Sequence, residues 1–490
     1  MTPELRQQRP MDAPGNALPL EPSAQQMREL TRIASDFAID FVSRLPDMAA
    51  MDMDGARALA AKFREPVPEN GQPLEELLKE VAAGAEKGFN TAGPGYLAYI
   101  PAGGLFTAAL AELIGAAMNR YVTVWSASPV CAQIEATVLR WFADLFGLPA
   151  EARGVLTSGG SMSNLSAIVT ARRARLPEDF LRGTLYVTDQ AHASVAKAAM
   201  IAGFPRERIR TVPTTPELRI DLDATRELIR ADRSAGLQPF CLVASAGTTN
   251  TGAVDPLDAC ADLAKEEGLW LHADAAYGGF FQLTERGRRK LRGLERADSI
   301  ALDPHKGLFL PYGAGALLVR DGRRLREAHA LGAEYLQDLG GEEEIPNFTD
   351  YSPELSRGFR GLRAWLPIQL HGLAAFRQAL DEKLDLAAWA HRALGEVPGL
   401  ELPWAPELSV VAFRLKPAGG GAGDAELDDL NQRLLERINA SRRVFLSSTR
   451  VRGRFLIRLC VLSARTHRDR VEEAVAIIRQ AAELSGGSGR

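Results

Sequence analysis

Hydrophobic periodicity divides the chain into a helical N-terminal part and a longer part in which strands and helices alternate. Residues 1–22 are rich in Pro, Gln and Gly and show no periodicity, so we expect a flexible tail there. Helices are predicted over residues 24–45 and 74–87. The helical segment 23–92 is too small for a comfortable core of its own, so we expect it to pack on a second subunit. Apolar side chains recur at helical spacing in the first helix, at Met27, Leu30, Ile33, Phe37 and Phe41.

From residue 93 to residue 378, short apolar runs alternate with helical patterns. This alternation predicts an α/β domain built on a mostly parallel sheet with helices on both faces. The predicted strands are residues 154–157, 184–188, 240–245, 269–273 and 299–302. The predicted helices cover residues 163–176, a segment that begins near residue 194, and residues 256–267.

Residues 379–490 have the pattern of a small α+β domain. Strands are predicted at 409–416, 444–446 and 454–461, with a glycine-rich loop at 418–423 after the first of them. Helices are predicted at 426–438 and 467–484.

Composition and charge narrow the classes of function. The chain has 490 residues, of which 46% are hydrophobic and 24% charged, as in ordinary globular proteins. A net charge of -4 argues against nucleic acid or an anionic membrane as a partner. The four cysteines lie far apart, so we expect neither a disulfide framework nor a metal site. No signal peptide and no membrane-length apolar run is evident, and a cytoplasmic enzyme is expected.

Two segments offer parts of a cofactor site. In Thr157-Ser-Gly-Gly-Ser-Met-Ser-Asn164, paired glycines join a strand to a helix, where free N–H groups attract a phosphate and Gly160 permits close approach. The alternative is an ordinary turn with a serine cap. His192 follows another strand, where it can stack on a flat ring or be a purely structural histidine.

Two further segments end in titratable groups. Asp274 terminates an apolar strand, where a protonated pyridine nitrogen would neutralise it, and Ala276 leaves room for the face of the ring; a helix N-cap is the alternative. In Asp303-Pro-His-Lys306, the Lys306 amine can hold an aldehyde cofactor as a Schiff base. His305 can reach a phosphate or a substrate carboxylate.

These four parts follow one another at the carboxyl ends of predicted strands, where open α/β sheets bind ligands. A phosphate loop, a stacking histidine, a carboxylate for a ring nitrogen and a lysine together predict pyridoxal 5'-phosphate (PLP) as the cofactor.

With these motifs the chain resembles the PLP-dependent group II amino-acid decarboxylases, a family that includes aromatic-L-amino-acid decarboxylase and glutamate decarboxylase. The similarity runs from about residue 93 to 372, and it is closer to the aromatic branch, notably at 125–129. Besides the motifs above, it rests on Tyr96-Leu-Ala-Tyr99-Ile-Pro101, Trp125-Ser-Ala-Ser-Pro-Val-Cys131, Gly247-Thr-Thr249 and Arg357-Gly-Phe-Arg-Gly-Leu-Arg-Ala-Trp365.

The resemblance implies an aspartate-aminotransferase-type fold and a homodimer with shared active sites. It also implies decarboxylation of an L-amino acid, aromatic by the closer branch, to an amine and carbon dioxide. By residue match, the cofactor contacts are Gly160, Ser161, His192, Thr249, Asp274, Ala276, Asp303, His305 and Lys306. Tyr99 and Pro101 wall the substrate pocket, and Tyr121 and Thr123 match positions that relatives present to the partner subunit's substrate.

Relatives return a proton to the substrate Cα from a tyrosine on a loop, which corresponds here to about residues 333–357. We expect Tyr351 to supply this proton, with Tyr335 as the second candidate and an ordinary surface tyrosine as the alternative. Three positions depart from the family. Gly307 replaces the usual tryptophan, Asp303 a common asparagine, and Thr123 an aromatic residue of animal enzymes. These departures are predicted to alter the pocket and leave the cofactor chemistry intact.

Other functions on the same fold remain open. They include oxidative decarboxylation to an aldehyde, transamination and sulfur removal. A non-catalytic PLP-binding homologue is a further alternative, although such a protein would have no chemical need for Lys306, Asp274 and His192 together.

Overall fold

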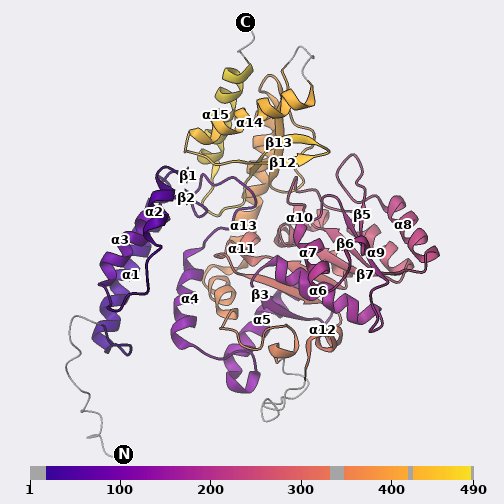
Figure 1. Ribbon diagram of the computed structural model, residues 1–490, viewed down its shortest axis with the longest axis horizontal. Coiled ribbons are helices and arrows are strands. Elements are labelled where there is room, and N and C mark those ends of the chain that lie inside the picture. The colour runs from indigo at the N-terminus through magenta and orange to yellow at the C-terminus, as the bar shows by residue number, and fades with distance from the viewer. Residues whose placement is uncertain (1–17, 332–346, 418–422, 487–490) are drawn as a thin grey trace, which may run out of the picture.

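The computed structural model describes residues 18–331, 347–417 and 423–486. Most of the predicted tail and of the loop at 418–423 therefore lies outside the described residues. Figure 1 shows a central sheet among helices, a second and smaller sheet beyond it toward the C-terminus, and a group of N-terminal helices at the side.

Seven strands form the central sheet, in the spatial order β3-β9-β8-β7-β6-β4-β5. The neighbours from β8 to β5 pair in parallel, whereas β9 runs antiparallel to both β3 and β8. The sheet is thus mostly parallel, as the alternating pattern predicts. The strands are β3 (Arg153–Thr157), β4 (Gly183–Thr188), β5 (Ile209–Val212), β6 (Gln238–Ser245), β7 (Trp270–Asp274), β8 (Ser299–Leu302) and β9 (Gly315–Val319).

Helices cover both faces of this sheet. Every residue of β7, β8 and β9 is buried, and alternate side chains of a strand point to opposite faces, so neither face is open to solvent. α6 (Gly160–Arg175) lies across five of the strands and packs against α7 (Ala193–Ile201) and α12 (Gly322–His329). α8 (Leu222–Ser234) and α9 (Leu257–Glu266) pack on β5, β6 and β7, and α5 (Pro129–Leu145) packs on β3 and β9.

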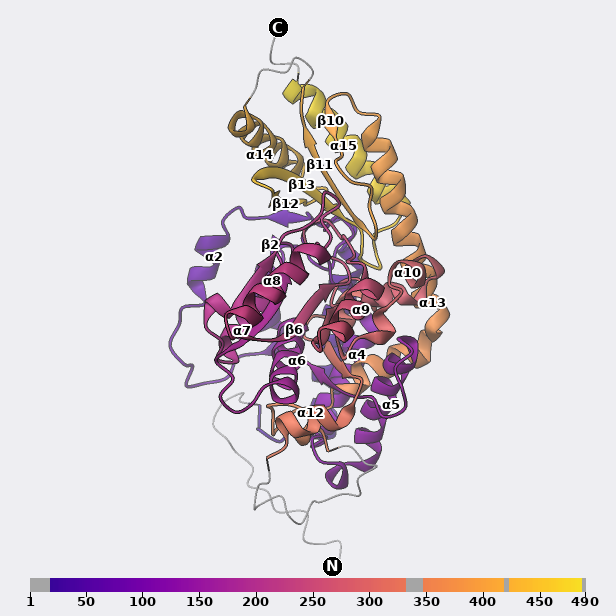
Figure 2. The same ribbon diagram turned by 90° about the vertical axis from the view of Figure 1, so that its right-hand side faces the viewer.

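Two longer helices connect the parts of the molecule. α4 (Phe106–Met118) packs on α13 (Gly361–Gly395), which Figure 2 shows running from the central sheet up to the C-terminal sheet. At Gly372 the backbone leaves the helical region with φ 71°, so α13 consists of two helices joined by a kink. Short elements complete this part: α10 (Glu285–Lys290), α11 (Pro304–Gly307) and the 3-10 turns η2 (Trp125–Ala127), η3 (Arg206–Arg208), η4 (Gly279–Leu283), η5 (Leu294–Arg296) and η7 (Phe348–Asp350).

The C-terminal part contains β10 (Leu400–Glu401), β11 (Val410–Leu415), β12 (Ser447–Val451) and β13 (Arg454–Cys460), paired antiparallel in the order β10-β11-β13-β12. α14 (Asp424–Ala440) and α15 (Arg468–Gly486) pack with this sheet. The predicted strand at 444–446 is wrong, because only Phe445 makes a bridge there, to Tyr96. A two-residue turn at Arg452 and Gly453, both with positive φ, instead sets the register of 447–451 against β13.

The N-terminal helices pack mainly on one another. They are α1 (Ala24–Arg44), α2 (Ala56–Lys62) and α3 (Leu74–Ala85), with a short pairing of β1 (Met51–Asp52) to β2 (Gly88–Phe89). A capping box of Ser23 and Gln26 begins α1. Neither α1 nor α3 has a buried residue, and Figure 1 shows both apart from the central sheet. None of the helices in the described ranges combines the length and apolar character needed to cross a membrane.

Candidate active site

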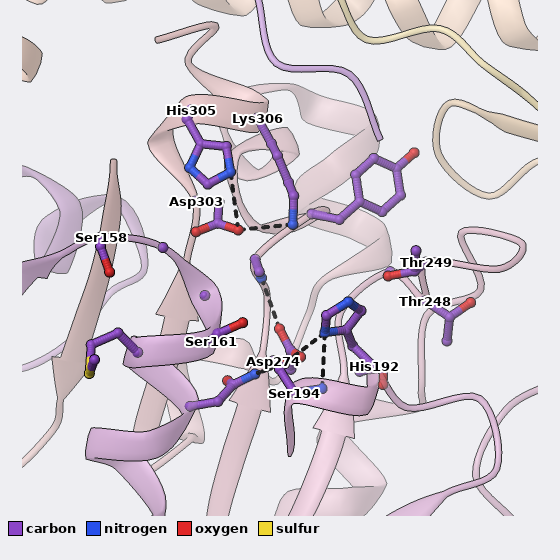
Figure 3. A pocket seen from close by; sticks show the side chains of 18 residues that line it. Ser158, Ser161, His192, Ser194, Thr248, Thr249, Asp274, Asp303, His305 and Lys306 are labelled. Carbon is purple, nitrogen blue, oxygen red and sulfur yellow. Dashed lines mark hydrogen bonds and ion pairs between the residues drawn. The ribbon is translucent and has the colours of Figure 1, made fainter. Parts of the chain in front are cut away.

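A cavity of about 310 Å³ opens at the carboxyl ends of β3, β4, β6, β7 and β8. Side chains from segments far apart in the sequence meet there, as Figure 3 shows. Every predicted cofactor-binding position lines this cavity: Gly160, Ser161, His192, Thr249, Asp274, Ala276, Asp303, His305 and Lys306.

The loop between β3 and α6 presents backbone donors to the cavity. Gly159 has φ 151° and ψ 174°, a conformation that glycine adopts readily. A Cβ on Gly160 would lie 3.0 Å from the Cβ of Ala276 and 3.1 Å from Oδ2 of Asp303, so the backbone there is closely packed. In the described part of the chain the N–H groups of Gly160 and Ser161 have no acceptor. Together with the positive end of the α6 dipole, they form a site for an anion.

Lys306 and His305 share one carboxylate. Lys306 Nζ lies 2.9 Å from Oδ2 of Asp303, and His305 Nε2 lies 3.6 Å from the same oxygen. His305 Nδ1 donates to the carbonyl of Ala314 at 2.7 Å. Burial lowers the pKa of His305, and the nearby Asp303 opposes that shift. The second oxygen of Asp303, Oδ1, is buried and finds no partner among the described residues.

Asp274 is nearly buried at the end of β7, with 7% of its surface exposed. Its Oδ1 accepts a hydrogen bond from the backbone N of Ala276, and its Oδ2 accepts one from Nδ2 of Asn164, both at 3.2 Å. No helix begins directly after it, since η4 starts at Gly279, and the N-cap alternative therefore does not hold. The carboxylate is held by two donors and has capacity for a further, cationic partner.

His192 lines the cavity from the start of α7. Its Nδ1 accepts from the backbone N of Ser194 at 3.3 Å and lies 2.7 Å from Oγ of that serine. The sequence did not single out Ser194 or Asn164 as site residues, although both stand within or beside the motifs. The sequence could have indicated them as polar residues at helix positions expected to face the sheet.

Arg458 was also missed by sequence reasoning. It lies on β13 and is 3% exposed. Its guanidinium donates to the carbonyls of Thr249 and Tyr99 and, at 2.8 Å, to that of Asn250. Burial lowers the pKa of Arg458. The C-terminal sheet therefore fastens the loop that carries Thr249. The sequence could have indicated Arg458 as a charged residue within an apolar strand.

The four predicted substrate-binding residues do not line the cavity within this chain. Tyr99 is half exposed with φ 51°, and Pro101 is buried. Tyr121 donates its hydroxyl to the carbonyl of Leu355 at 2.8 Å. Thr123 is fully buried, and its Oγ1 has no partner among the described residues.

Tyr351 lines a different cavity, of about 230 Å³, together with Arg153 and Phe348. The turn η7 folds this segment back toward β3 and α5, and burial raises the pKa of the Tyr351 hydroxyl. The chain does not bring Tyr351 to Lys306. The second candidate, Tyr335, lies outside the described residues.

Gly307 faces the protein core. A Cβ there would lie 2.6 Å from the Cβ of Phe280, and Gly307 does not line the cavity. Because Phe280 occupies the space beside Gly307, this departure does not change the lining of this cavity, and its effect on the substrate pocket stays a prediction. Asp303, by contrast, does line the cavity.

The site and fold agree with what comparison with known proteins finds. Residues 57–416 match the model of the pyridoxal-dependent decarboxylase conserved domain. The chain belongs to this family of PLP-dependent carboxy-lyases, as its motifs predict. It is 36% identical to an aromatic-L-amino-acid decarboxylase of Bacillus atrophaeus over 95% of this chain and 97% of that one.

Other relatives differ in their reaction. The chain is 28% identical to a phenylacetaldehyde synthase of Petunia hybrida, over 94% of this chain and 95% of that one. Its fold matches that of the Oryza sativa TDC crystallised with PLP and tryptamine, with a TM-score of 0.89 and 29% identity over 95% and 99% of the two chains.

The residues present fit the cofactor of the family. An anion site of free N–H groups, a buried carboxylate with spare acceptor capacity and a lysine all face one polar cavity. PLP carries an anionic phosphate, a basic ring nitrogen and an aldehyde, which correspond to these groups.

Proposed function

We propose that this protein decarboxylates an aromatic L-amino acid to the corresponding amine and carbon dioxide. The observation that carries the proposal is the meeting of Lys306, Asp274 and His192 in one cavity with the glycine loop. The aromatic substrate is supported by the relatives named for aromatic decarboxylation and by the structure crystallised with tryptamine.

In this proposal each side chain keeps one part of the cofactor in place. Gly160 and Ser161 would hold the phosphate through their backbone N–H groups, and Lys306 would hold the aldehyde carbon. Asp274 would face the ring nitrogen, and His192 would lie on the face of the ring. The remaining contacts would come from Thr249, Ala276, Asp303 and His305.

When bound, PLP withdraws electrons from the substrate Cα and so permits loss of the carboxylate. Asp274 favours that chemistry because a buried carboxylate stabilises a proton on the group it faces. Lys306 begins as the partner of Asp303 and must leave it to react, while His305 remains beside the same oxygen. The low exposure of Asp274 keeps water from weakening its interactions.

We propose further that the active form is a homodimer. Large apolar side chains are exposed on α4, and α1 and α3 bury nothing within one chain. In a dimer the predicted substrate residues Tyr99, Pro101, Tyr121 and Thr123 would belong to the wall between two sites.

A second candidate is oxidative decarboxylation to an aldehyde, which the phenylacetaldehyde synthase relative favours. The two reactions separate by product. Decarboxylation releases one amine per carbon dioxide, whereas the oxidative reaction consumes dioxygen and water and releases aldehyde, carbon dioxide, ammonia and hydrogen peroxide.

The test is a screen of the common L-amino acids for carbon dioxide release by the purified holoenzyme, with amine and aldehyde measured together. We expect release from tryptophan, tyrosine or phenylalanine, with amine in excess. Release from glutamate alone would contradict the proposed substrate class, and equal aldehyde and carbon dioxide would favour the second candidate.

The same assay tests the proton donor. Because Tyr351 lies in another cavity, Tyr351→Phe is expected to leave the amine-to-aldehyde ratio unchanged. A ratio shifted toward aldehyde would support Tyr351 as the proton donor. Tyr335→Phe tests the second candidate for the proton donor with the same ratio.

A further inference from the structure

A chain of buried hydrogen bonds runs behind the carboxylate of Asp274. Trp270 Nε1 donates to Oγ of Ser299 at 2.8 Å, and the same Oγ lies 2.9 Å from Nδ1 of His272. Nε2 of His272 then lies 2.9 Å from Oδ1 of Asn164. Trp270, Ser299, His272 and Asn164 are each at most 3% exposed, so water does not compete with these bonds.

The direction of every bond in this chain follows from chemistry. A carboxylate only accepts, so the Asn164 atom beside Asp274 is the amide nitrogen, and its oxygen faces His272. His272 therefore carries its hydrogen on Nε2, and its bare Nδ1 accepts from the hydroxyl of Ser299. The indole of Trp270 can only donate, which leaves the serine hydroxyl hydrogen free for His272. Burial lowers the pKa of His272 to about 4, in agreement with a neutral ring.

Asn164 is the branch point of the chain. Its amide nitrogen has two hydrogens, one directed to Oδ2 of Asp274 at 3.2 Å and one to Oγ of Ser194 at 2.9 Å. Ser194 Oγ is thereby an acceptor, and its own hydrogen points to Nδ1 of His192 at 2.7 Å. The backbone N of Ser194 donates to the same ring nitrogen. His192 therefore carries its hydrogen on Nε2, since its other ring nitrogen faces Ser194 (Figure 3).

We propose that Asn164 is a positioning residue that sets both the Asp274 carboxylate and the tautomer of His192. The chain Trp270–Ser299–His272 fixes the orientation of its amide. A single side chain then aligns the group proposed to face the ring nitrogen and the group proposed to lie on the ring face. The effect of Asn164 on the cofactor rests on the proposed function, whereas the hydrogen-bond geometry of Asn164 does not depend on it.

Cofactor affinity provides the first test. PLP is titrated into the apoprotein and followed by visible absorbance for the native chain, Asn164→Leu, Ser299→Ala and Ser166→Ala. Leucine is close to asparagine in shape and removes both donors. A lost hydrogen bond to a charged group corresponds to a Kd raised about tenfold or more in Asn164→Leu. A smaller rise, about threefold, is expected for Ser299→Ala, which acts only through His272.

Ser166→Ala is the matched control, since Ser166 is buried on the same helix and its hydroxyl has no partner among the described residues. Its Kd is expected to stay within twofold of the native value. An Asn164→Leu protein that melts within a few degrees of Ser166→Ala and binds PLP as tightly would overturn the proposal.

The tautomers provide a second test that needs no cofactor. In the apoprotein with ¹⁵N-labelled histidine, NMR is expected to show His192 and His272 as neutral rings with the hydrogen on Nε2, assigned with His192→Gln and His272→Gln. In Asn164→Leu the signal of His192 is expected to change. A native His192 with its hydrogen on Nδ1 contradicts the relay. Failure of the native chain to bind PLP contradicts the proposed function instead, and the NMR result still decides the relay.

Discussion

At the scale of single residues, Asp303 distinguishes this site from the asparagine common in its relatives. Its Oδ2 pairs with Lys306, while its unpartnered Oδ1 lies near the glycine loop. A carboxylate beside a site for a phosphate repels the ligand, at a cost on the order of 1 kcal/mol.

We therefore expect Asp303→Asn to bind PLP about fivefold more tightly than the native chain, as measured by titration of the apoprotein. Asp298→Asn, at the opposite end of β8, serves as the control and should leave the Kd unchanged. Weaker binding by Asp303→Asn would show that the ion pair with Lys306 outweighs the repulsion.

A buried histidine makes stability depend on pH. Burial lowers the pKa of His272 to about 4, below its ordinary value of 6.5. Between these values the unfolded chain binds a proton that the folded chain excludes, so the contribution of His272 is complete above pH 6.5 and is lost as pH falls toward 4. Asp255 opposes this trend, because burial raises its pKa to about 6 and its protonation stabilises the folded chain as pH falls.

Over pH 7 to 4.5, the native apoprotein is expected to lose on the order of 2 kcal/mol more unfolding free energy than His272→Gln. Urea unfolding at several pH values measures this difference. Asp255→Asn should change the slope in the opposite direction, and equal slopes for the native chain and His272→Gln would contradict the assigned neutral ring.

The cavity-lining residues Lys306, Asp274 and His192 were predictable one by one, since each lies at or shortly after the carboxyl end of a strand. The residues that were missed act through contacts distant in sequence. Asn164 meets His272 across 108 positions, and Arg458 meets Thr249 across 209, so local pattern carries no sign of either contact. The packing of Gly307 was unpredictable for the same reason, because its neighbour Phe280 lies on another segment.

At the scale of elements, a buried ion pair fastens the segment before α13 to α5. Glu135 and Arg357 bond to each other with both side chains fully buried, and Arg357 also donates to the carbonyl of Leu156 at 3.2 Å. Cζ of Arg357 lies 4.5 Å from the ring centre of Phe348. Removing one charge from such a pair leaves the other buried and uncompensated.

Glu135→Gln is therefore expected to lower the unfolding free energy by about 3–5 kcal/mol in urea denaturation. The exposed pair of Arg289 and Glu285 gives the control, where Glu285→Gln should cost less than about 1 kcal/mol. If the two variants unfold alike, the pair does not stabilise this junction. The double variant Glu135→Leu, Arg357→Met is expected to recover part of the loss.

Regular elements were predicted best where one pattern dominated. The strand 299–302 was predicted at its observed bounds, whereas α6 begins at Gly160, three residues before its predicted start at 163. The error at 444–446 arose because Val444 and Leu446 are buried under a sheet without being paired in it. Apolar character marks burial, while pairing depends on the turn at Arg452 and Gly453.

At the scale of the whole molecule, one chain leaves apolar surface uncovered. Leu113 and Ile114 of α4 are 55% and 45% exposed, and the N-terminal helices bury no residue in α1 or α3. The class of fold was predictable from alternating strands and helices. The proposed contact with a second copy rests on the small helical segment 23–92 and on this exposed apolar surface.

The double variant Leu113→Asp, Ile114→Asp is expected to shift the protein from dimer to monomer. Side chains of this size each contribute about 1.5–3 kcal/mol to association when a dimer buries them. Light scattering after size exclusion measures the mass. Leu181→Asp, also 51% exposed but outside α4, should remain a dimer. A native protein that is monomeric at all concentrations would contradict the proposed homodimer and its shared active sites.

The most direct measurement for the whole account compares the native chain with Lys306→Ala, each incubated with PLP and an aromatic L-amino acid. The native protein is expected to show the visible absorbance of covalently held PLP and to release carbon dioxide. Lys306→Ala should fold with an unchanged melting temperature as apoprotein, lose that absorbance and release none above background. Carbon dioxide release retained by Lys306→Ala would contradict the assignment of Lys306, and with it the proposed active site.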